Sequence, residues 1–255
     1  MRDPMLSDLV APLRSDPSGS VLLFDFDGTL APIVDSPLAA RPASGVVDLL
    51  DQLAAKYRLV AAVSGRPVDF LAEHLPASIA LSGLYGLESR IDGLREVRPG
   101  VERWRPVVAR AAAQAEAAAI HGVIVERKGL SVTLHFRLRS QAAAAVTGLA
   151  TELATATGLD LRPAKMSVEL HPPVAVDKGV VVRELAVGAR AVLYAGDDLG
   201  DLPAFAALGE LRAAGVTAVG IAVETSELPA ELRSVADALV VGPTGAIDLL
   251  RALAP

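Results

Sequence analysis

Residues 21–29 read VLLFDFDGT, and this segment gives the strongest indication of the fold class. Val21 to Phe24 form an unbroken apolar run, which is typical of a strand covered on both faces. Two aspartates and a glycine follow at once, where the strand must end. Parallel sheets bind their ligands beyond the carboxyl ends of the strands. The stretch therefore predicts a buried parallel strand with a polar site at its end.

The sequence on both sides repeats this alternation of buried strand and helix, which predicts an α/β fold with a doubly wound parallel sheet. After the first strand we expect a helix over 44–56, with Ser44 as its N-cap, then a strand over 58–65 and a helix from Pro67. Near the other end we expect helices over 177–187, 202–208 and 245–253 and strands over 191–198, 217–223 and 237–242.

The middle of the chain has a different pattern. We expect helices over 101–120 and 140–156, a hairpin over 122–137 with its turn at Lys128–Gly129, and strands over 159–163 and 166–171. The second run of the hairpin alternates apolar and polar residues, which indicates one buried and one wet face. The prediction is a core from residues 1–84 and 172–255, with an α+β cap domain at 85–171 inserted between them.

Asp25 and Asp27 are the first candidate site residues. Their spacing sends both side chains to the same side of a strand. Two such carboxylates repel each other unless a cation or a proton is present, and Gly28 gives the turn its conformational freedom. A polar loop is the simpler interpretation of two aspartates alone. A calcium-binding EF-hand does not fit, because the glycine is fourth in the motif and not sixth.

Three further motifs carry chemistry. Ser64 follows the second strand in VSGR, Lys178 begins a helix in VDKGV, and Asp197, Asp198 and Asp201 follow a strand in AGDDLGD. Taken singly, these are also compatible with a helix-cap serine, a surface lysine and a solvated acidic loop. A carboxylate cluster without histidine or cysteine nearby favours Mg²⁺, and a serine and a lysine at strand and helix ends favour a phosphate.

In this order, with an insertion between the second and third, the four motifs resemble those of the haloacid dehalogenase-like phosphatases. The resemblance implies that Asp25 attacks phosphorus and that Asp27 donates and then accepts a proton. It also implies that Ser64 and Lys178 hold the phosphoryl oxygens. Mg²⁺ would lie on Asp25, on the backbone carbonyl of Asp27 and on Asp197. Asp198 and Asp201 would bind the metal's waters or orient Lys178, and the spacing does not decide between these two roles.

The cap region resembles the trehalose-6-phosphate phosphatases in LSGLYGLE (81–88), VERKGLSVTLHFR (125–137) and VELHPPVAVDKG (168–179). The resemblance implies that Glu126, Lys128 and Glu169 contact sugar hydroxyls, and we also place Arg66 of VSGR among the substrate-binding residues. Without the resemblance, an exposed ion pair on the hairpin is the alternative. Tyr85 departs from the family pattern, since many relatives have histidine there.

These resemblances predict a Mg²⁺-dependent enzyme that hydrolyses trehalose 6-phosphate to trehalose and phosphate through a phospho-aspartate. The alternatives are a phosphatase of the same chemistry acting on another sugar or pseudo-disaccharide phosphate and, more distantly, a non-catalytic sugar-phosphate sensor. A sensor is expected to have lost Asp25 or Asp27, and both are present.

The amino-acid composition limits the partners and the cellular location that we expect for the protein. The 255 residues carry a net charge of −6 and include no cysteine, which excludes disulfides and thiolate chemistry and argues against nucleic acid as a partner. No apolar run is long enough to span a membrane, and the first ten residues do not resemble a signal peptide. We therefore expect a cytoplasmic protein with a small sugar phosphate as its partner. The sequence does not indicate an oligomeric state.

Overall fold

The computed structural model describes residues 6–164, 166–226 and 228–254. The chain divides into two compact units. The first consists of Met1–Val34, Ala40–Glu96 and Val176–Pro255, and the second of Asp35–Ala39 and Val97–Ala175. The functional division that we drew at 84/85 and 171/172 remains a proposal.

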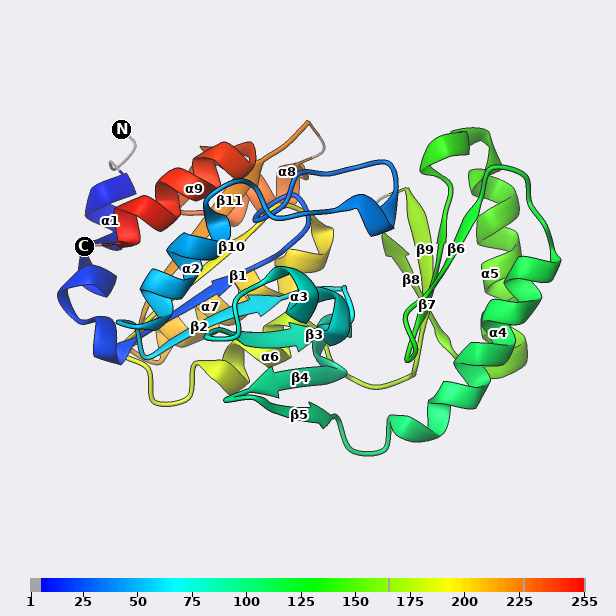
Figure 1. Ribbon diagram of the computed structural model, residues 1–255, viewed down its shortest axis with the longest axis horizontal. Helices are drawn as coiled ribbons and strands as arrows, with labels where there is room; N and C mark the ends of the chain where they lie inside the picture. Colours follow the sequence, from blue (N-terminus) through cyan, green and yellow to red (C-terminus); the bar gives the residue numbers. More distant parts are fainter. Residues whose placement is uncertain (1–5, 165, 227, 255) are drawn as a thin grey trace. The chain divides into compact units, whose positions relative to one another are not determined.

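The first unit contains a sheet of eight strands among the described residues, in the order β12-β11-β10-β1-β2-β3-β4-β5 (Figure 1). Neighbours from β12 to β3 are parallel, and β4 is antiparallel to β3. The predicted doubly wound parallel sheet is thus confirmed. The strands are β1 (Ser20–Phe24), β2 (Leu59–Val63), β3 (Ala80–Gly83), β4 (Glu88–Ile91), β5 (Leu94–Val97), β10 (Ala191–Gly196), β11 (Thr217–Glu224) and β12 (Ala238–Val241).

Helices cover both faces of this sheet because alternate strand residues point to opposite sides. Leu22 and Phe24 of β1 pack with one group of helices, and Val21 and Leu23 pack with the other. Figure 1 shows α2 and α9, which belong to the first group, lying side by side. The first group is α1 (Leu6–Ser15), α2 (Val46–Ala54), α3 (Val68–His74) and α9 (Gly242–Leu253); the second is α6 (Lys178–Leu185), α7 (Leu202–Ala213) and α8 (Ala230–Val235).

Strand β1 lies at the centre, with β2 on one side and β10 on the other. The chain leaves β1 toward β2 in the first half of the sequence and returns beside it as β10 in the second half. This is the point at which strand order reverses, and ligands bind there in open parallel sheets. Asp25 follows β1 directly and therefore lies at the switch point of the sheet.

The start of α2 differs from the prediction. The N-cap is Gly45, with φ of 88°, and no side chain caps the helix. Ser44 is therefore not the N-cap, and the prediction was wrong. The chain enters this helix through a left-handed residue, which glycine adopts without steric cost, whereas an N-cap serine needs an extended backbone.

The segment after residue 83 is structured, which was not predicted from the sequence. The short 3₁₀ helix η3 (Leu84–Gly86) leads into β4, which returns antiparallel to β3 by pairing Glu88 with Gly83. Strands β4 and β5 thus extend the sheet of the first unit. Their short sequences, ESRI and LREV, contain charged residues and lack the apolar run that revealed the central strands.

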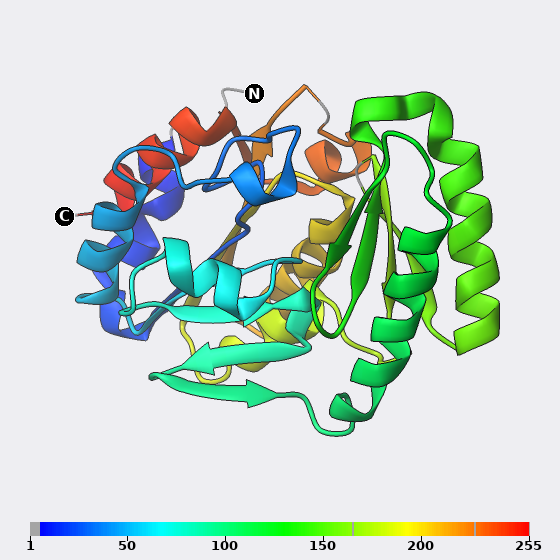
Figure 2. The ribbon, with the colours of Figure 1, turned by 45° about the vertical axis from the view of Figure 1, so that its right-hand side comes forward.

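The second unit is an antiparallel sheet in the order β6-β7-β9-β8, with α4 and α5 packed together on one side of it (Figure 2). The elements follow the predicted sequence of helix, hairpin, helix and two strands. They are α4 (Arg105–Ala117), β6 (Ile124–Arg127), β7 (Val132–His135), α5 (Ala143–Thr157), β8 (Asp160–Ala164) and β9 (Ser167–His171).

No helix within residues 6–164, 166–226 and 228–254 is both long enough and apolar enough to cross a membrane.

Candidate active site

Asp25 lies at the end of the central strand and is almost fully buried, with 4% of its surface exposed. Its backbone N–H donates to the carbonyl of Ala195, which continues the pairing of β1 with β10. Its Oδ1 lies 2.7 Å from Nζ of Lys178. The sheet thus holds Asp25 rigidly beside a buried cation.

Lys178 is the first residue of α6 and is also buried, with 2% exposed. Its Nζ donates to Oδ1 of Asp201 over 2.6 Å, in addition to its contact with Asp25. Asp177 caps the helix by accepting from the N–H of Val180. A lysine at a helix N-terminus needs an anion nearby, and the two carboxylates provide this charge in the structure.

The charges in this cluster depend on one another. Burial raises the pKa of Asp25 well above its ordinary value; Lys178 opposes this shift and Asp201 adds to it. Burial by itself lowers the pKa of Lys178, but the carboxylates of Asp201 and Asp25 outweigh it, so the pKa of the lysine rises well above its ordinary value. Lys178 therefore stays protonated. The ionised form of Asp25 is disfavoured by burial, and a second cation would stabilise it.

Asp201 holds this cluster together. It is completely buried, and its Oδ1 accepts hydrogen bonds from Lys178 and from the hydroxyl of Tyr194. Its Oδ2 accepts from the backbone N–H groups of Asp197 and Asp198. Four donors saturate one carboxylate, so Asp201 fixes the position of both the lysine and the acidic loop.

Asp198 has a different environment. Its side chain is partly exposed and accepts from the N–H of Gly200, which caps the short 3₁₀ helix η6 (Leu199–Asp201). The structure thus distinguishes the two aspartates that the sequence analysis left open. Asp201 orients Lys178, and Asp198 shapes the loop.

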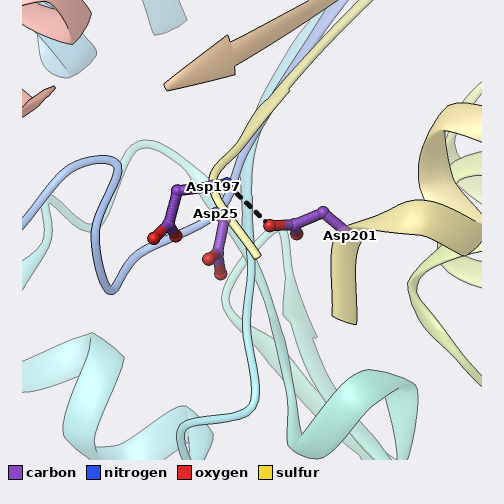
Figure 3. A group of neighbouring side chains, drawn as sticks. All are labelled: Asp25, Asp197 and Asp201. Carbon is purple, nitrogen blue, oxygen red and sulfur yellow. Dashed lines mark hydrogen bonds between the residues drawn. The ribbon is translucent and has the colours of Figure 1, made fainter. Parts of the chain in front are cut away.

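Three carboxylates form a group that fits a metal ion. One oxygen each of Asp25, Asp197 and Asp201 lies within 4.8 Å of the others, and all three residues are buried (Figure 3). Asp197 lies directly over Gly28, where an added Cβ atom would lie 2.1 Å from its Oδ2. Because Asp201 already accepts four hydrogen bonds, Asp25 and Asp197 are the side chains best placed to bind a cation.

Asp27 is held by Arg66. The guanidinium donates two hydrogen bonds to it, from Nε to Oδ2 and from Nη2 to Oδ1, both of 2.7 Å. The same guanidinium lies 4.7 Å from the ring centroid of Phe70. Ser64 is buried, and its hydroxyl accepts from the backbone N–H of Arg66. The VSGR motif thus positions both predicted residues next to the DFDGT loop.

Tyr85 belongs to the same neighbourhood. Its N–H donates to the carbonyl of Ser64, and its own φ of 58° is left-handed. Its ring leaves no room for a Cβ at Gly65, which would lie 2.7 Å from the ring, and it also lies near Gly200. A side chain held in a strained backbone at a functional site often has a role there. In the sequence, Tyr85 was noticeable only because many relatives have histidine at this position.

In the second unit the structure brings together the three residues predicted to bind sugar. Nζ of Lys128 lies 3.3 Å from Oε2 of Glu169 and 3.9 Å from Oε2 of Glu126. All three side chains are at least 88% buried, so an exposed ion pair does not describe them. His135 was not among the predicted site residues, and its Nε2 lies 2.7 Å from Oε2 of Glu126.

Comparison with known proteins identifies the family. The model of the family described as trehalose-phosphatase matches residues 23–236. The chain belongs to this family. The match covers the DFDGT strand, the VSGR motif, the second unit and the acidic loop, so the resemblance inferred from these motifs is confirmed.

The trehalose-phosphate phosphatase of Mycobacterium ulcerans is 34% identical over 201 residues, which cover 74% of this chain and 51% of the relative. The chain spans about half the length of the curated relatives of this name that it matches. Among solved structures, a trehalose-6-phosphate phosphatase related protein matches with a TM-score of 0.77 and 26% identity, over 91% of this chain and 95% of that one. The C-terminal domain of C. albicans trehalose-6-phosphate phosphatase shares the fold, with a TM-score of 0.80 and 23% identity over 100% of this chain and 97% of that one.

Proposed function

We propose that the protein is a Mg²⁺-dependent phosphatase that hydrolyses trehalose 6-phosphate to trehalose and phosphate. The observation that carries this proposal is the buried cluster of Asp25, Lys178 and Asp201 at the switch point of the sheet. Membership of the trehalose-phosphatase family supports the substrate.

In the first step, a carboxylate oxygen of Asp25 attacks phosphorus and the bond from phosphorus to the sugar oxygen breaks. The leaving oxygen takes a proton from Asp27, and trehalose departs from a phospho-aspartate. Lys178 and Ser64 hold the phosphoryl oxygens as charge builds on them. Asp27 has to leave its ion pair with Arg66 to carry a proton, and a substrate phosphate is a suitable new partner for that guanidinium.

In the second step, water attacks the phosphorus of the phospho-aspartate. Asp27 takes the proton of the water, the bond between phosphorus and the Asp25 oxygen breaks, and inorganic phosphate leaves. The two steps divide a difficult hydrolysis into two displacements at the same phosphorus atom. Asp25 returns as a carboxylate and Asp27 is protonated for the next turnover.

We assign Mg²⁺ to the Asp25 and Asp197 carboxylates, with the backbone carbonyl of Asp27 as a further ligand. Asp201 would orient Lys178 beside the ion, and Asp198, in the same acidic loop as Asp197, would contact the waters of the ion. When bound, the ion would reduce the repulsion between the anionic nucleophile and the anionic substrate. The buried, oxygen-only donor set is of the kind that Mg²⁺ prefers.

We assign recognition of the sugar to Glu126, Lys128 and Glu169, and we also count Arg66 among the substrate-binding residues. Carboxylates that accept hydrogen bonds from hydroxyls, combined with a lysine that donates to them, discriminate strongly against a substrate that leaves them unpaired.

Tyr85 favours a second candidate, another sugar or pseudo-disaccharide phosphate, because this residue differs from many relatives and lies against the VSGR loop.

The decisive experiment measures phosphate release from trehalose 6-phosphate, glucose 6-phosphate and other sugar phosphates, with and without Mg²⁺. We expect Mg²⁺-dependent release with a strong preference for trehalose 6-phosphate, abolished in a folded Asp25→Asn variant. Retained activity in that variant would reject the phospho-aspartate mechanism. Binding of the substrate without any release would favour the sensor.

The sugar assignment has its own test. Glu126→Ala should raise KM for trehalose 6-phosphate, while Glu152→Ala on the exposed side of α5 should leave it unchanged. Equal kinetics in both variants would overturn the role of Glu126, and efficient hydrolysis of a different sugar phosphate would select the second candidate.

A further inference from the structure

The sheet of the second unit has two chemically different faces. Val132, Leu134, Val168 and Leu170 lie on the face that packs against α4 and α5. The opposite face carries a row of polar residues that are direct cross-strand partners: Glu126 pairs with Thr133, Thr133 with Glu169, and Glu169 with Arg162. Directly opposite residues share a face of a sheet. We call this row, together with Lys128 and His135, the polar face.

Thr133 occupies the centre of the polar face. It lies on the middle strand β7, between the two glutamates assigned to the sugar. Lys128 and His135 also contact these glutamates, since Nζ of Lys128 lies 3.3 Å from Oε2 of Glu169 and Nε2 of His135 lies 2.7 Å from Oε2 of Glu126. Any molecule that hydrogen-bonds to both glutamates therefore passes over Thr133.

The hydroxyl of Thr133 lacks a partner among the residues that the structure describes. The residue is 98% buried, and its Oγ1 accepts and donates no hydrogen bond there. Oε1 of Glu169, on the neighbouring strand, is in the same state, although the residue is 99% buried. Leaving a buried polar group unpaired is costly, so two such atoms on directly paired residues of the polar face point to a polar ligand as their partner.

We propose that Thr133 is a specificity-determining residue that hydrogen-bonds to a sugar hydroxyl of the substrate. This inference rests on the proposed function and adds a residue to it. The carboxylate of Glu169 only accepts hydrogen bonds, whereas a threonine hydroxyl both donates and accepts. A sugar hydroxyl that donates to Oε1 of Glu169 can accept from Thr133, so both unpaired atoms find partners in a single polyol.

A purely structural role of Thr133 and a role in substrate binding predict different effects of the Thr133→Val substitution. Valine has the shape of threonine and fits a strand equally well, and it would remove an unsatisfied hydroxyl from a buried position. If Thr133 only fills space, Thr133→Val should leave the kinetics unchanged. If it binds the substrate, the same variant should be at least as stable as the unaltered protein and yet bind its substrate less well.

The test compares the 255-residue protein with its Thr133→Val, Thr133→Ser and Thr151→Val variants. Thr151 is the matched control, because it lies exposed on α5 and its hydroxyl donates to the carbonyl of Thr147. The measurements are the thermal midpoint, kcat and KM for trehalose 6-phosphate, and the inhibition constant of inorganic phosphate, which carries no sugar hydroxyl.

For Thr133→Val we expect a thermal midpoint that is equal or higher, a KM raised about tenfold and kcat changed less than about threefold, as for the loss of one hydrogen bond to the substrate. The inhibition constant of phosphate should stay the same. Thr133→Ser should restore most of the affinity, and Thr151→Val should match the unaltered protein.

An unchanged KM in Thr133→Val, with normal turnover of trehalose 6-phosphate by the unaltered protein, would overturn the assignment of Thr133 alone. A rise in KM that Thr133→Ser does not restore would also reject it. Failure of the unaltered protein to release phosphate from trehalose 6-phosphate would overturn both this inference and the proposed function.

Discussion

The hydroxyl of Tyr194 donates a 2.5 Å hydrogen bond to Oδ1 of Asp201, and both side chains are fully buried. Burial raises the pKa of Tyr194 well above its ordinary value, and the Asp201 carboxylate adds to this shift, so the tyrosine remains a donor. The same carboxylate oxygen holds Lys178. A residue in the middle of strand β10 thus helps to position the lysine of the candidate active site.

We predict that Tyr194→Phe keeps the fold and lowers turnover. Loss of a hydrogen bond to a buried carboxylate costs about 1.5–3 kcal/mol of stability. Asp201 would then hold Lys178 less firmly, and we expect kcat to fall by about three- to thirtyfold, because small displacements of catalytic groups are expensive. Steady-state kinetics and urea unfolding measure the two effects.

Tyr57→Phe is the matched control for this change. Its hydroxyl is also buried and donates to the carbonyl of Leu253, and the residue packs in the cluster of apolar side chains on the other face of the sheet. We expect a stability loss of about 1 kcal/mol and unchanged kcat. A similar loss of activity in both tyrosine variants would show that Tyr194 acts through general stability alone.

The two aspartates of the acidic loop should respond differently to the same substitution. In Asp201→Asn an amide replaces a buried carboxylate that accepts from four donors, and Lys178 loses one of its partners. We expect destabilisation of about 3–5 kcal/mol. Asp198→Asn keeps an oxygen that can accept from Gly200 on a partly exposed side chain, so its stability should change by less than about 1 kcal/mol. Chemical denaturation of both variants decides this, and equal losses would contradict it.

This difference shows what sequence patterns can and cannot predict. The apolar runs predicted the central strands, because a strand buried on both faces has few other compositions. The order of DFDGT, VSGR, DKG and GDDLGD predicted which residues meet, because strand ends converge at one edge of the sheet. The separate roles of Asp198 and Asp201 depend on which donors each carboxylate reaches. Tyr194 lies within an apolar strand, and His135 lies within VERKGLSVTLHFR, but neither position indicated its hydrogen bond to Asp201 or Glu126.

Gly28 provides a second test of the site, because both its backbone conformation and the space around it require glycine. Its φ is +82°, and an added Cβ would overlap the carboxylate of Asp197. We predict that Gly28→Ala loses at least about a hundredfold in activity, because Asp197 must move away from the position in which it can bind a metal ion with Asp25. Calorimetric titration with Mg²⁺ should show a parallel loss of affinity.

Gly45→Ala separates backbone strain from this displacement. Its φ is +88°, but no atom lies within 4 Å of an added Cβ. The substitution should cost about 1–2 kcal/mol of stability, as left-handed backbone strain does, and leave activity unchanged. Equal activity losses at Gly28 and Gly45 would mean that strain, and not the position of Asp197, explains the first result.

The pKa of Asp25 predicts how activity depends on pH and Mg²⁺ together. Burial raises this pKa well above the ordinary value of an aspartate, so Asp25 takes up a proton at a higher pH than an exposed carboxyl does. Only the ionised form can attack phosphorus or bind the cation.

Activity should therefore fall on the acid side as pH decreases through the raised pKa of Asp25, and Mg²⁺ should compete with the proton for this carboxylate. Once the Mg²⁺ concentration exceeds the dissociation constant of the ion for ionised Asp25, each further tenfold increase should move this acid limb about one unit to lower pH. Profiles of kcat/KM against pH at several Mg²⁺ concentrations measure the shift. An acid limb that stays in place at all of them would show that protonation of Asp25 does not limit the reaction.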